Sequence, residues 1–360
     1  ARGFEGANDR GAAGIRREVG HGAIYTFGFD LLGFHSARCY VNCFDPGRDL
    51  FALMMKGALR EATKGHFAVE HTVPGPEPGV FVTSHDIDAP DAFWQGPWGK
   101  PGALQMAEME KAEGVEASYF ITTDFVTGYW RPELVRELCH LGNCPEGGHS
   151  VQHLGWTDFP VGDCKVTRAE YDPTKPTLCG EIVLNYKELI LAAGKKKLAL
   201  DGWRTPYLEN NPLQFEYLAA AGVKWDSSVG IGDVRSNLPF IGKNFPYHQV
   251  DLFRGQEIVH FPVVLEDGIG WFEDGVEFRK ELHNGTWPDF RTRWTNAMVR
   301  NAANNAWTVQ LVHPSFGVGE GVGQENVIIK IASVQYAIRL AKQLGLRIAR
   351  LSTLGPFWRG

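Results

Sequence analysis

The sequence lacks an uninterrupted apolar run of the roughly 18 residues that a helix needs to cross a bilayer, so no membrane span is expected. It also lacks an excess of basic residues: 36 Lys and Arg stand against 42 Asp and Glu, and the formal net charge is -6. This balance argues against a general nucleic-acid binder, which needs a basic face to neutralise phosphates. No repeat of about 20–50 residues is visible, which argues against a solenoid or propeller array.

What the chain does contain is an ordinary globular composition. Of its 360 residues, 44% are apolar and 22% are charged, which is typical of one large or two ordinary folded domains. The first 79 residues differ: they begin rich in glycine and arginine, turn apolar over residues 23–32 and show helical spacing over residues 50–63. A stiff Pro/Gly-rich connector at residues 74–79 follows. We therefore expect an N-terminal appendage of unassigned role (1–79) and a larger main domain (80–360).

Cysteines give an indication of the compartment. The six cysteines form three pairs that are close in sequence: Cys39 with Cys43, Cys139 with Cys144, and Cys164 with Cys179. An even, locally paired set favours disulfides, which form in oxidising compartments. No tandem C-x-x-C pairs are present, which argues against a zinc site built from thiolates. We expect an exported protein, extracellular or periplasmic; the alternative is six reduced thiols in a cytosolic enzyme.

From residue 80 onward, short apolar runs alternate with stretches of helical spacing. The predicted strands cover residues 80–83, 117–122, 198–203, 223–225, 308–312 and 346–351. The predicted helices cover residues 101–113, 132–141, 179–193, 213–221 and 327–344. Strands that alternate with helices are typical of parallel βαβ units. Because polar clusters follow the strands, as catalytic loops do in barrel enzymes, a barrel is favoured over an open sheet.

Five short polar clusters stand beside these strand ends. They are Ser84-His85-Asp86-Ile87-Asp88, His149-Ser150-Val151-Gln152-His153, Arg204-Thr205-Pro206-Tyr207, Asp226-Ser227-Ser228 and Leu311-Val312-His313. Together they supply carboxylates, two imidazoles four residues apart, a guanidinium and a further imidazole. Such a set can hold one divalent metal, activate a water molecule and protonate a leaving group. The clusters therefore predict a metallohydrolase.

The first two clusters contain the candidate metal ligands. Asp86 and Asp88 are two residues apart, so they share one face on a strand and can diverge at its frayed end. One carboxylate is needed as a ligand and another as general base; the alternative is a pair of turn or capping aspartates. His149 and His153 are spaced i, i+4, so one helical turn would place both imidazoles on the same side. Ordinary surface or core histidines also show this spacing.

The remaining clusters supply partners for these groups. Arg204 follows a predicted strand, and its guanidinium could bind a carboxylate and keep it ionised. Tyr207 could stack on a sugar, or its backbone N–H could face a developing oxyanion. Asp226 could orient His313, pair with an arginine or cap a helix. His313 follows an apolar strand and is placed to act as general acid.

In this order, the clusters resemble the motifs of the polysaccharide deacetylases, a carbohydrate esterase family that removes N- or O-acetyl groups from glycans. Residues 114–120 are similar to the family's second strand and residues 345–354 to its last, so the resemblance covers roughly residues 80–354 and leaves out the appendage. It implies an α/β fold, an irregular (β/α)7 barrel. It also implies one divalent metal ion, usually zinc and sometimes cobalt or nickel.

Position by position, the resemblance implies Asp86 as the catalytic base and Asp88, His149 and His153 as the metal ligands. One departure concerns the first motif, since the family's usual adjacent aspartates are here separated by Ile87. A spaced pair resembles the branch that contains cyclic-imide hydrolases and some peptidoglycan deacetylases. The residues before the second motif also differ from the family's usual glycine-histidine-glutamate run. These departures leave the chemistry intact and bear on the substrate.

The resemblance assigns the other motif residues as well. Arg204 would tether the base, the Tyr207 backbone would help form the oxyanion hole, and His313 would be the acid. Asp226 would support this acid or the arginine.

The leading prediction is a metal-dependent hydrolase that removes acetyl groups from N-acetylated sugars of a peptidoglycan- or chitin-like polysaccharide. A glycan is then the expected partner, and the tryptophans near the motif strands are candidates for stacking on sugar rings: Trp94, Trp98, Trp130 and Trp156. A second hypothesis is hydrolysis of a small cyclic amide or imide by the same catalytic step. A third is a catalytically silent carbohydrate-binding protein, against which the retention of every motif residue argues. The sequence assigns no oligomeric state.

Overall fold

The structure is a computed structural model of the chain. It describes residues 14–20, 22–27, 55, 57–65, 73–94, 99–155, 158–194, 198, 200–211, 214, 217–218, 221–230, 240–241, 258–267, 287–315 and 325–358. The chain divides into two compact units, one comprising residues 1–37 and 44–71 and the other residues 38–43 and 72–360.

The smaller unit contains an antiparallel hairpin. Its strands are β1 (Gly14–Val19) and β2 (Gly22–Phe27), joined through Gly20, which has a positive φ of 58°. Residues 57–62 are helical, within the predicted helix at residues 50–63. The Arg16 side chain, on β1, donates to the Glu61 carboxylate. The hairpin itself was not predicted, because glycine and arginine at its start hide the period-two alternation of a strand.

The larger unit is organised around a mostly parallel sheet. Its strands are β3 (Val80–Ile87), β4 (Ser118–Ile121), β5 (Gly147–Gly148), β6 (Gly202–Trp203), β7 (Trp225–Asp226), β8 (Phe240–Ile241), β9 (Val259–His260), β10 (Val263–Glu266), β11 (Trp307–Val312) and β12 (Arg347–Ile348). Their order is β10-β11-β3-β4-β5-β6-β7-β9-β8, and β12 also pairs with β3. Of the described pairs in this sheet, β8–β9 is antiparallel and the others are parallel.

Two strands that are neighbours in sequence close this sheet on itself. β9 pairs with β7 and β8 at one end of the order, whereas β10 pairs with β11 at the other end. Only Phe261 and Pro262 separate them, so one stretch of chain joins both ends of the sheet. If β9 and β10 are taken as one broken strand, the parallel strands around the barrel are β3, β4, β5, β6, β7, β9–β10 and β11. The predicted α/β barrel is therefore confirmed.

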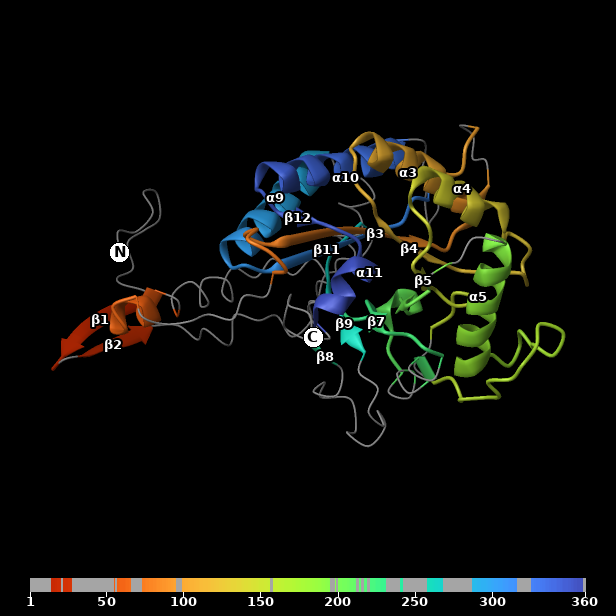
Figure 1. Ribbon diagram of the computed structural model, residues 1–360, viewed down its shortest axis with the longest axis horizontal. Helices are drawn as coiled ribbons and strands as arrows, with labels where there is room; N and C mark the ends of the chain where they lie inside the picture. Colours follow the sequence, from red (N-terminus) through yellow and green to blue (C-terminus); the bar gives the residue numbers. More distant parts are fainter. Residues whose placement is uncertain are drawn as a thin grey trace. The chain divides into compact units, whose positions relative to one another are not determined.

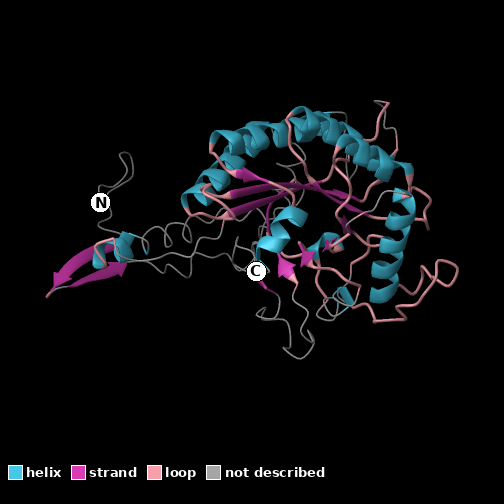
Figure 2. Cartoon of the chain, in the orientation of Figure 1, coloured by secondary structure: helices cyan, strands magenta, loops and turns pink. Residues whose placement is uncertain are grey.

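Helices cover the outside of the barrel. They are α2 (Pro90–Phe93), α3 (Gly102–Ala112), α4 (Glu133–Leu141), α5 (Leu178–Ala193), α9 (Trp287–Ala303) and α10 (Glu325–Gln343). The short helix α11 (Leu351–Leu354) packs instead with the apolar cluster inside the barrel. Figures 1 and 2 show α9, α10, α3, α4 and α5 following one another around the strands. No helix among the described residues is both long and apolar enough to cross a bilayer.

Alternation along β3 separates two cores. Val80 and Val82 belong to an apolar cluster inside the barrel together with Phe120 and residues of α11. Ile87 belongs instead to a cluster with residues of α3, α4 and α5, on the outer side. Successive side chains of a strand point to opposite faces, so Ser84 and Asp86 share the inner face with the two valines. The inner face thus turns from apolar to polar toward the carboxyl end of the strand.

Most of the predicted elements are found, with corrections where tertiary contacts decide the length. The predicted helices at residues 101–113, 132–141, 179–193 and 327–344 correspond to α3, α4, α5 and α10. The strands predicted at 198–203 and 346–351 shorten to β6 and β12, and the chain enters α11 directly after the latter. The helix predicted at 213–221 lies largely outside the described residues. Helix α9 and strands β9 and β10 were not predicted.

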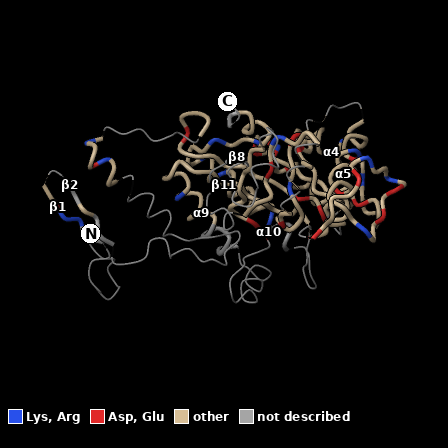
Figure 3. Tube along the Cα trace, turned by 90° about the horizontal axis from the view of Figure 1, so that it is seen from below, with Lys and Arg blue, Asp and Glu red and all other residues tan. Residues whose placement is uncertain are grey.

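Neither sign of charge dominates the described part of the larger unit (Figure 3). On the outer helix α4, an acidic and a basic side chain form an exposed pair, Glu133 with Arg136 at 3.4 Å. Exposed pairs of this kind contribute little to stability. We interpret this helix face as solvated surface.

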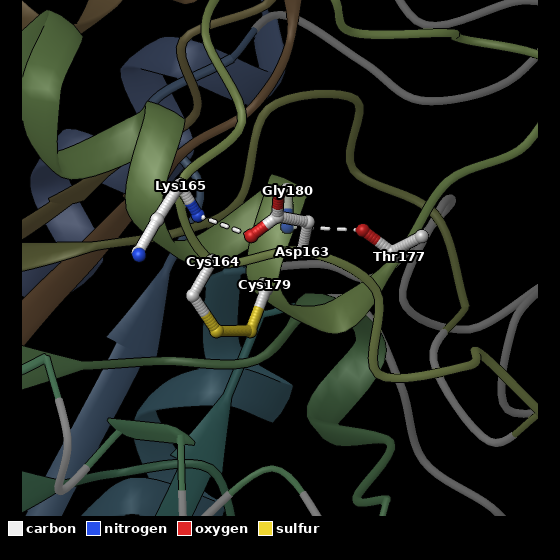
Figure 4. Close-up of a disulfide and its surroundings, with 6 residues drawn as sticks. All are labelled: Asp163, Cys164, Lys165, Thr177, Cys179 and Gly180. Atoms are coloured by element: carbon white, nitrogen blue, oxygen red, sulfur yellow. Dashed lines mark hydrogen bonds between the residues drawn. A yellow bond between two sulfur atoms is a disulfide. The ribbon is translucent and has the colours of Figure 1, made fainter.

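Disulfides join two of the three predicted cysteine pairs. Cys139 in α4 is bonded to Cys144, and Cys164 is bonded to Cys179 in the first turn of α5; the Cys39 and Cys43 pair lies outside the described residues. Figure 4 shows the second bond beside two hydrogen bonds that order the ends of the loop it closes. The backbone N–H of Lys165 donates to Asp163, and that of Gly180 donates to the helix cap Thr177.

Removing the second disulfide is expected to cost more stability than removing the first. The Cys164–Cys179 bond closes 15 residues and the Cys139–Cys144 bond only 5, and the closure entropy that a disulfide removes from the unfolded chain grows with loop length. Changing both Cys164 and Cys179 to serine should lower the free energy of unfolding by about 3 kcal/mol. Urea denaturation measures this, with the double serine variant of the shorter loop as matched control. Equal losses in both variants would contradict the loop-length argument.

Candidate metal centre

The predicted ligands meet at the carboxyl end of the barrel strands. Asp86 lies in β3 and Asp88 directly follows it, while His149 and His153 lie in the loop after β5. The Nε2 atom of His153 is 3.1 Å from Asp88 Oδ2, and the two imidazole ring centres are 4.9 Å apart. One donor atom from each of Asp88, His149 and His153 lies within 4.8 Å of the others. The arrangement is that of a three-ligand site with positions left for water and substrate.

The segment that carries both histidines is a loop, so the expected helical turn is wrong. Residues 149–153 have no helical assignment, and Ser150 and His153 have positive φ values of 68° and 55°. Positive φ is costly for residues other than glycine and persists only where the surroundings enforce it. The His153 N–H donates to Ser150 Oγ at 3.0 Å. The two imidazoles therefore converge through a tight, strained turn.

The donor atoms are suited to a divalent cation. His149 Nδ1 lies 2.8 Å from the backbone oxygen of Arg204, an acceptor only, so Nδ1 carries the proton and the Nε2 lone pair is available. Both His149 Nε2 and Asp88 Oδ1 are buried, and neither has a hydrogen-bond partner among the described residues. Buried polar atoms are rarely left unsatisfied. A divalent ion such as zinc, which takes imidazole and carboxylate ligands, would satisfy both.

Electrostatics keeps His149 and Asp88 in their metal-binding forms. Burial lowers the pKa of His149 to about 4, even though the Asp86 carboxylate favours the charged imidazole. For Asp88, burial opposes ionisation, but His313 and His153 outweigh it and hold the pKa of this carboxyl below its usual range. A neutral imidazole and an ionised carboxylate are the forms that bind metal.

Helix α5 holds the ligand loop in place. The Glu181 carboxylate accepts hydrogen bonds from the backbone N–H groups of Val151 and Gln152 at 2.9 and 3.0 Å. Asn185 accepts from the N–H of His149 at 3.2 Å and donates to the backbone oxygen of Ser150. The glycine that precedes His149 leaves room for this, because a Cβ there would collide with the Asn185 side chain.

Asp86 is held by a buried arginine. Arg204 donates to Asp86 Oδ1 at 3.0 Å and to Ser84 Oγ at 2.9 Å. It also donates to the backbone oxygen of Ser227 at 2.9 Å and to its hydroxyl at 2.8 Å, and its guanidinium lies 4.2 Å from the centre of the Phe120 ring. The guanidinium is fully buried, so its charge is balanced locally by Asp86. The predicted contact between these two residues is present.

His313 is held by a carboxylate that the sequence analysis did not identify. Its Nδ1 lies 2.7 Å from Asp267 Oδ1, and its backbone N–H donates to Asp267 Oδ2 at 3.1 Å. Its Nε2 is 3.6 Å from Asp88 Oδ2. The contact expected of Asp226 thus belongs to Asp267, because Asp267 follows β10, which adjoins the histidine strand β11, whereas Asp226 lies on β7.

Charge around His313 keeps it protonated. Burial alone would lower its pKa, but Asp267 and Asp88 outweigh this and raise the pKa of His313 to about 10. Burial likewise works against ionisation of Asp267, yet Lys330 and His313 hold the pKa of that carboxyl well below its usual range. An imidazole protonated at neutral pH can donate a proton.

A second group of donor atoms, from Glu266, Asp267 and His313, lies next to the first. Here a cation is already present, since Lys330 Nζ is 2.8 Å from Asp267 Oδ2. Burial raises the pKa of Glu266 to about 8, which favours its neutral form. The first cluster has two buried ligand atoms without a hydrogen-bond partner, His149 Nε2 and Asp88 Oδ1, whereas the second is already paired with Lys330, so the first is the better candidate for a metal.

Asp226 organises the neighbouring strand end. It accepts from the backbone N–H and the hydroxyl of Ser228, and it pairs with His260 Nδ1 at 3.0 Å. Ser228 Oγ in turn accepts from the backbone N–H of Thr205 at 2.9 Å. The expected support of the arginine is thus indirect: Asp226 fixes the turn next to Arg204.

Two partly exposed aromatic side chains, Tyr207 and Trp94, lie near the ligand cluster. Tyr207, a residue with a φ of 56° that is 52% exposed, lies with its ring centre 4.6 Å from that of His153. Trp94 is 47% exposed and donates to the backbone oxygen of Tyr129, whose own hydroxyl donates to the backbone oxygen of Asp88. Both rings are partly exposed, and the Arg131 guanidinium lies 5.9 Å from the centre of the Trp94 ring.

The other predicted sugar-stacking residues are not available in this way. Trp130 is only 7% exposed and packs edge-on against Phe93 in the core, so its ring has no free face for a sugar. Trp98 and Trp156 lie outside the described residues.

The sequence contains a signal for Glu266 and Asp267, the two acidic residues near His313 that were not predicted. Residues 258–265 are almost entirely apolar and rich in β-branched side chains, and Glu266 and Asp267 follow directly. This is the same pattern as the buried strand that leads to Asp86 and Asp88. The pattern shows that acids stand at a strand end, but not that this strand lies next to the one that carries His313.

Comparison with known proteins bears on the fold. No family model matches the chain, and no curated protein matches it. Among solved structures, one assigned as a polysaccharide deacetylase from Mycobacterium smegmatis is similar, with a TM-score of 0.52 and 16% identity over 82% of this chain and 95% of that one. The Puue allantoinase structure is similar as well, with a TM-score of 0.51 and 12% sequence identity; the match covers 82% of this chain and 94% of that one. The fold is thus an α/β barrel with a candidate metal site at its strand ends. It is the fold of the polysaccharide deacetylases.

Proposed function

We propose that this protein is a metal-dependent hydrolase that removes acetyl groups from N-acetylated sugars of a polysaccharide. The observation that carries the proposal is the Asp88, His149 and His153 cluster, with its unsatisfied buried donor atoms. It has a carboxylate on one side, Asp86, and a protonated imidazole on the other, His313. Base, metal ligands and acid thus converge on one place, as amide hydrolysis requires.

Each residue has a separate task in this proposal. When bound, a divalent ion supplies a Lewis acid that polarises the acetyl carbonyl and makes water more acidic. Asp86 takes the proton of the attacking water, and Arg204 keeps this carboxylate ionised and oriented. His313 protonates the departing amine, with Asp267 holding its Nδ1 side. The backbone N–H of Tyr207 is proposed as an oxyanion donor.

The substrate class rests on the exposed aromatic rings. Tyr207 and Trp94 are partly exposed rings of the kind that stack on sugars. The second candidate is hydrolysis of a small cyclic amide or imide, because Ile87 separates Asp86 and Asp88 as in the branch that contains cyclic-imide hydrolases as well as some peptidoglycan deacetylases. Zinc is the proposed ion, with cobalt and nickel as alternatives. The two disulfides support export to an oxidising compartment.

One experiment separates these possibilities. Metal-depleted protein is reloaded with zinc, cobalt or nickel, and acetate release is measured from chitin oligomers and from peptidoglycan fragments. Ring opening of cyclic imides is measured in parallel. Metal-dependent acetate release supports the proposal, and ring opening alone would replace it with the second candidate. Metal binding without either reaction on these panels would favour a silent binding protein.

Asp86→Asn is expected to keep the metal and to lower kcat by about 10²–10⁴-fold, the usual contribution of a general base. The amide is nearly isosteric but cannot take the proton of water. Metal analysis and acetate release measure the two effects, and Asp88→Asn is the matched control because it should lose metal as well. If Asp86→Asn lost the metal while Asp88→Asn kept it, the two roles would have to be exchanged.

A further inference from the structure

A lysine on helix α10 reaches the residues that hold the proposed acid. Lys330 Nζ is 2.8 Å from Asp267 Oδ2 and donates to the backbone oxygen of His313 at 3.0 Å. The side chains of Lys330 and Asp267 are 18% and 2% exposed, respectively. No motif marks this position: Lys330 stands in the second turn of helix α10, 17 residues after His313.

The three residues form a closed set of contacts. Asp267 accepts from the backbone N–H of His313 and from its Nδ1, so one carboxylate holds both the main chain and the ring of this residue. Lys330 then holds the other end of the same peptide segment, through the His313 backbone oxygen. Strand β11 ends at Val312, immediately before His313, so the strand ladder no longer fixes the chain there.

Charge explains why a cation is needed at this position. Asp267 is buried, and a buried carboxylate is costly unless it is paired and hydrogen-bonded. His313 alone can balance it only while the imidazole is protonated, and a general acid gives up that proton in every turnover. Lys330 supplies a positive charge that does not leave with the proton.

We propose that Lys330 is a positioning residue that fixes the His313 imidazole through Asp267 and through the His313 backbone. The proposal rests on the role given to His313 in the proposed function. Lys330 does not touch the substrate. It keeps Asp267 in the orientation that receives Nδ1, which leaves Nε2 directed toward the metal cluster, 3.6 Å from Asp88 Oδ2. A merely structural role, in which Lys330 ties α10 to the barrel, would place no demand on the imidazole.

The test compares three variants. Lys330→Met removes the charge and keeps most of the side-chain length, and Lys330→Arg keeps the charge. Lys342→Met is the matched control, because Lys342 lies on the same helix and binds Glu113, the residue that follows α3, instead of the site residues. Circular dichroism and thermal unfolding establish that each variant is folded.

The first readout does not require turnover. Zinc-loaded protein with ¹⁵N-labelled histidine is studied by NMR, and the Nδ1–H signal of His313 is assigned by its loss in His313→Ala. We expect a slowly exchanging Nδ1 proton in the wild type and in Lys342→Met, loss or broadening in Lys330→Met, and recovery in Lys330→Arg. An unchanged signal in Lys330→Met would overturn the proposal.

The second readout separates this proposal from the proposed function. Lys330→Met should lower kcat on an N-acetyl substrate by roughly 10- to 100-fold, the scale of a small misplacement of a catalytic group, with little change in KM or on an activated aryl acetate. Equal losses on both substrates would mark Lys330 as structural. If His313→Ala itself showed no dependence on the leaving group, the acid assignment would fail, and the NMR result would still decide whether Lys330 positions the ring.

Discussion

Replacing His149 by alanine is expected to empty the metal site and to abolish hydrolysis. The change removes an imidazole whose Nε2 has no partner among the described residues, and two protein ligands rarely retain such an ion. Metal analysis after dialysis should show a fall from a stoichiometric ion to background. His153→Ala should behave in the same way, since its Nε2 is the donor nearest to the Asp88 carboxylate.

A histidine elsewhere on the surface gives the matched control. His140 lies in the last turn of α4 and is exposed, so His140→Ala should keep both metal and activity. Full metal occupancy in His149→Ala or His153→Ala would contradict the ligand assignment. Loss of metal in His140→Ala would show instead that occupancy reports general damage to the fold.

His313→Ala should lower activity on an N-acetyl substrate by about 10²–10⁴-fold and have much less effect on nitrophenyl acetate. An amine leaves poorly unless it is protonated, whereas an activated phenolate leaves almost unaided. The environment of His313 fits this role, because the Asp267 and Asp88 carboxylates outweigh burial and raise the pKa of the imidazole to about 10. Steady-state kinetics on the two substrates measures the ratio.

Metal content is the control for this variant. His313 is not among the three proposed ligands, so His313→Ala should bind metal as the wild type does. Equal losses on both substrates, or loss of the metal, would show that the imidazole has another task. Asp267→Asn offers a graded comparison, since it keeps the hydrogen-bonding shape next to Nδ1 and removes the charge.

Local patterns in the sequence were sufficient to predict the positions of most helices of the barrel. Apolar periodicity and glycine stops placed α3, α4, α5 and α10, because a helix is decided by its own turn-to-turn spacing and its ends. The same reasoning failed for the ligand loop, where the i, i+4 spacing of His149 and His153 suggested a helix. There the chain adopts positive φ at Ser150 and His153 instead, enforced by hydrogen bonds that backbone N–H groups of the loop donate to Glu181 and Asn185 on α5.

The sequence by itself also determined which residues could do the chemistry, since carboxylates and imidazoles at strand ends can be recognised one strand at a time. Only the tertiary structure decided which of them meet. Asp267, and not Asp226, holds His313, because Asp267 follows β10 and β10 is the strand next to β11 in the barrel. Asp267 and His313 are 46 residues apart in the sequence. Lys330 reaches the same carboxylate from an outer helix. The spacing at which side chains share one face of a helix or strand is a local property of the backbone. Which side chains meet at the ends of the barrel strands depends instead on the order of the strands, and no local pattern encodes that order.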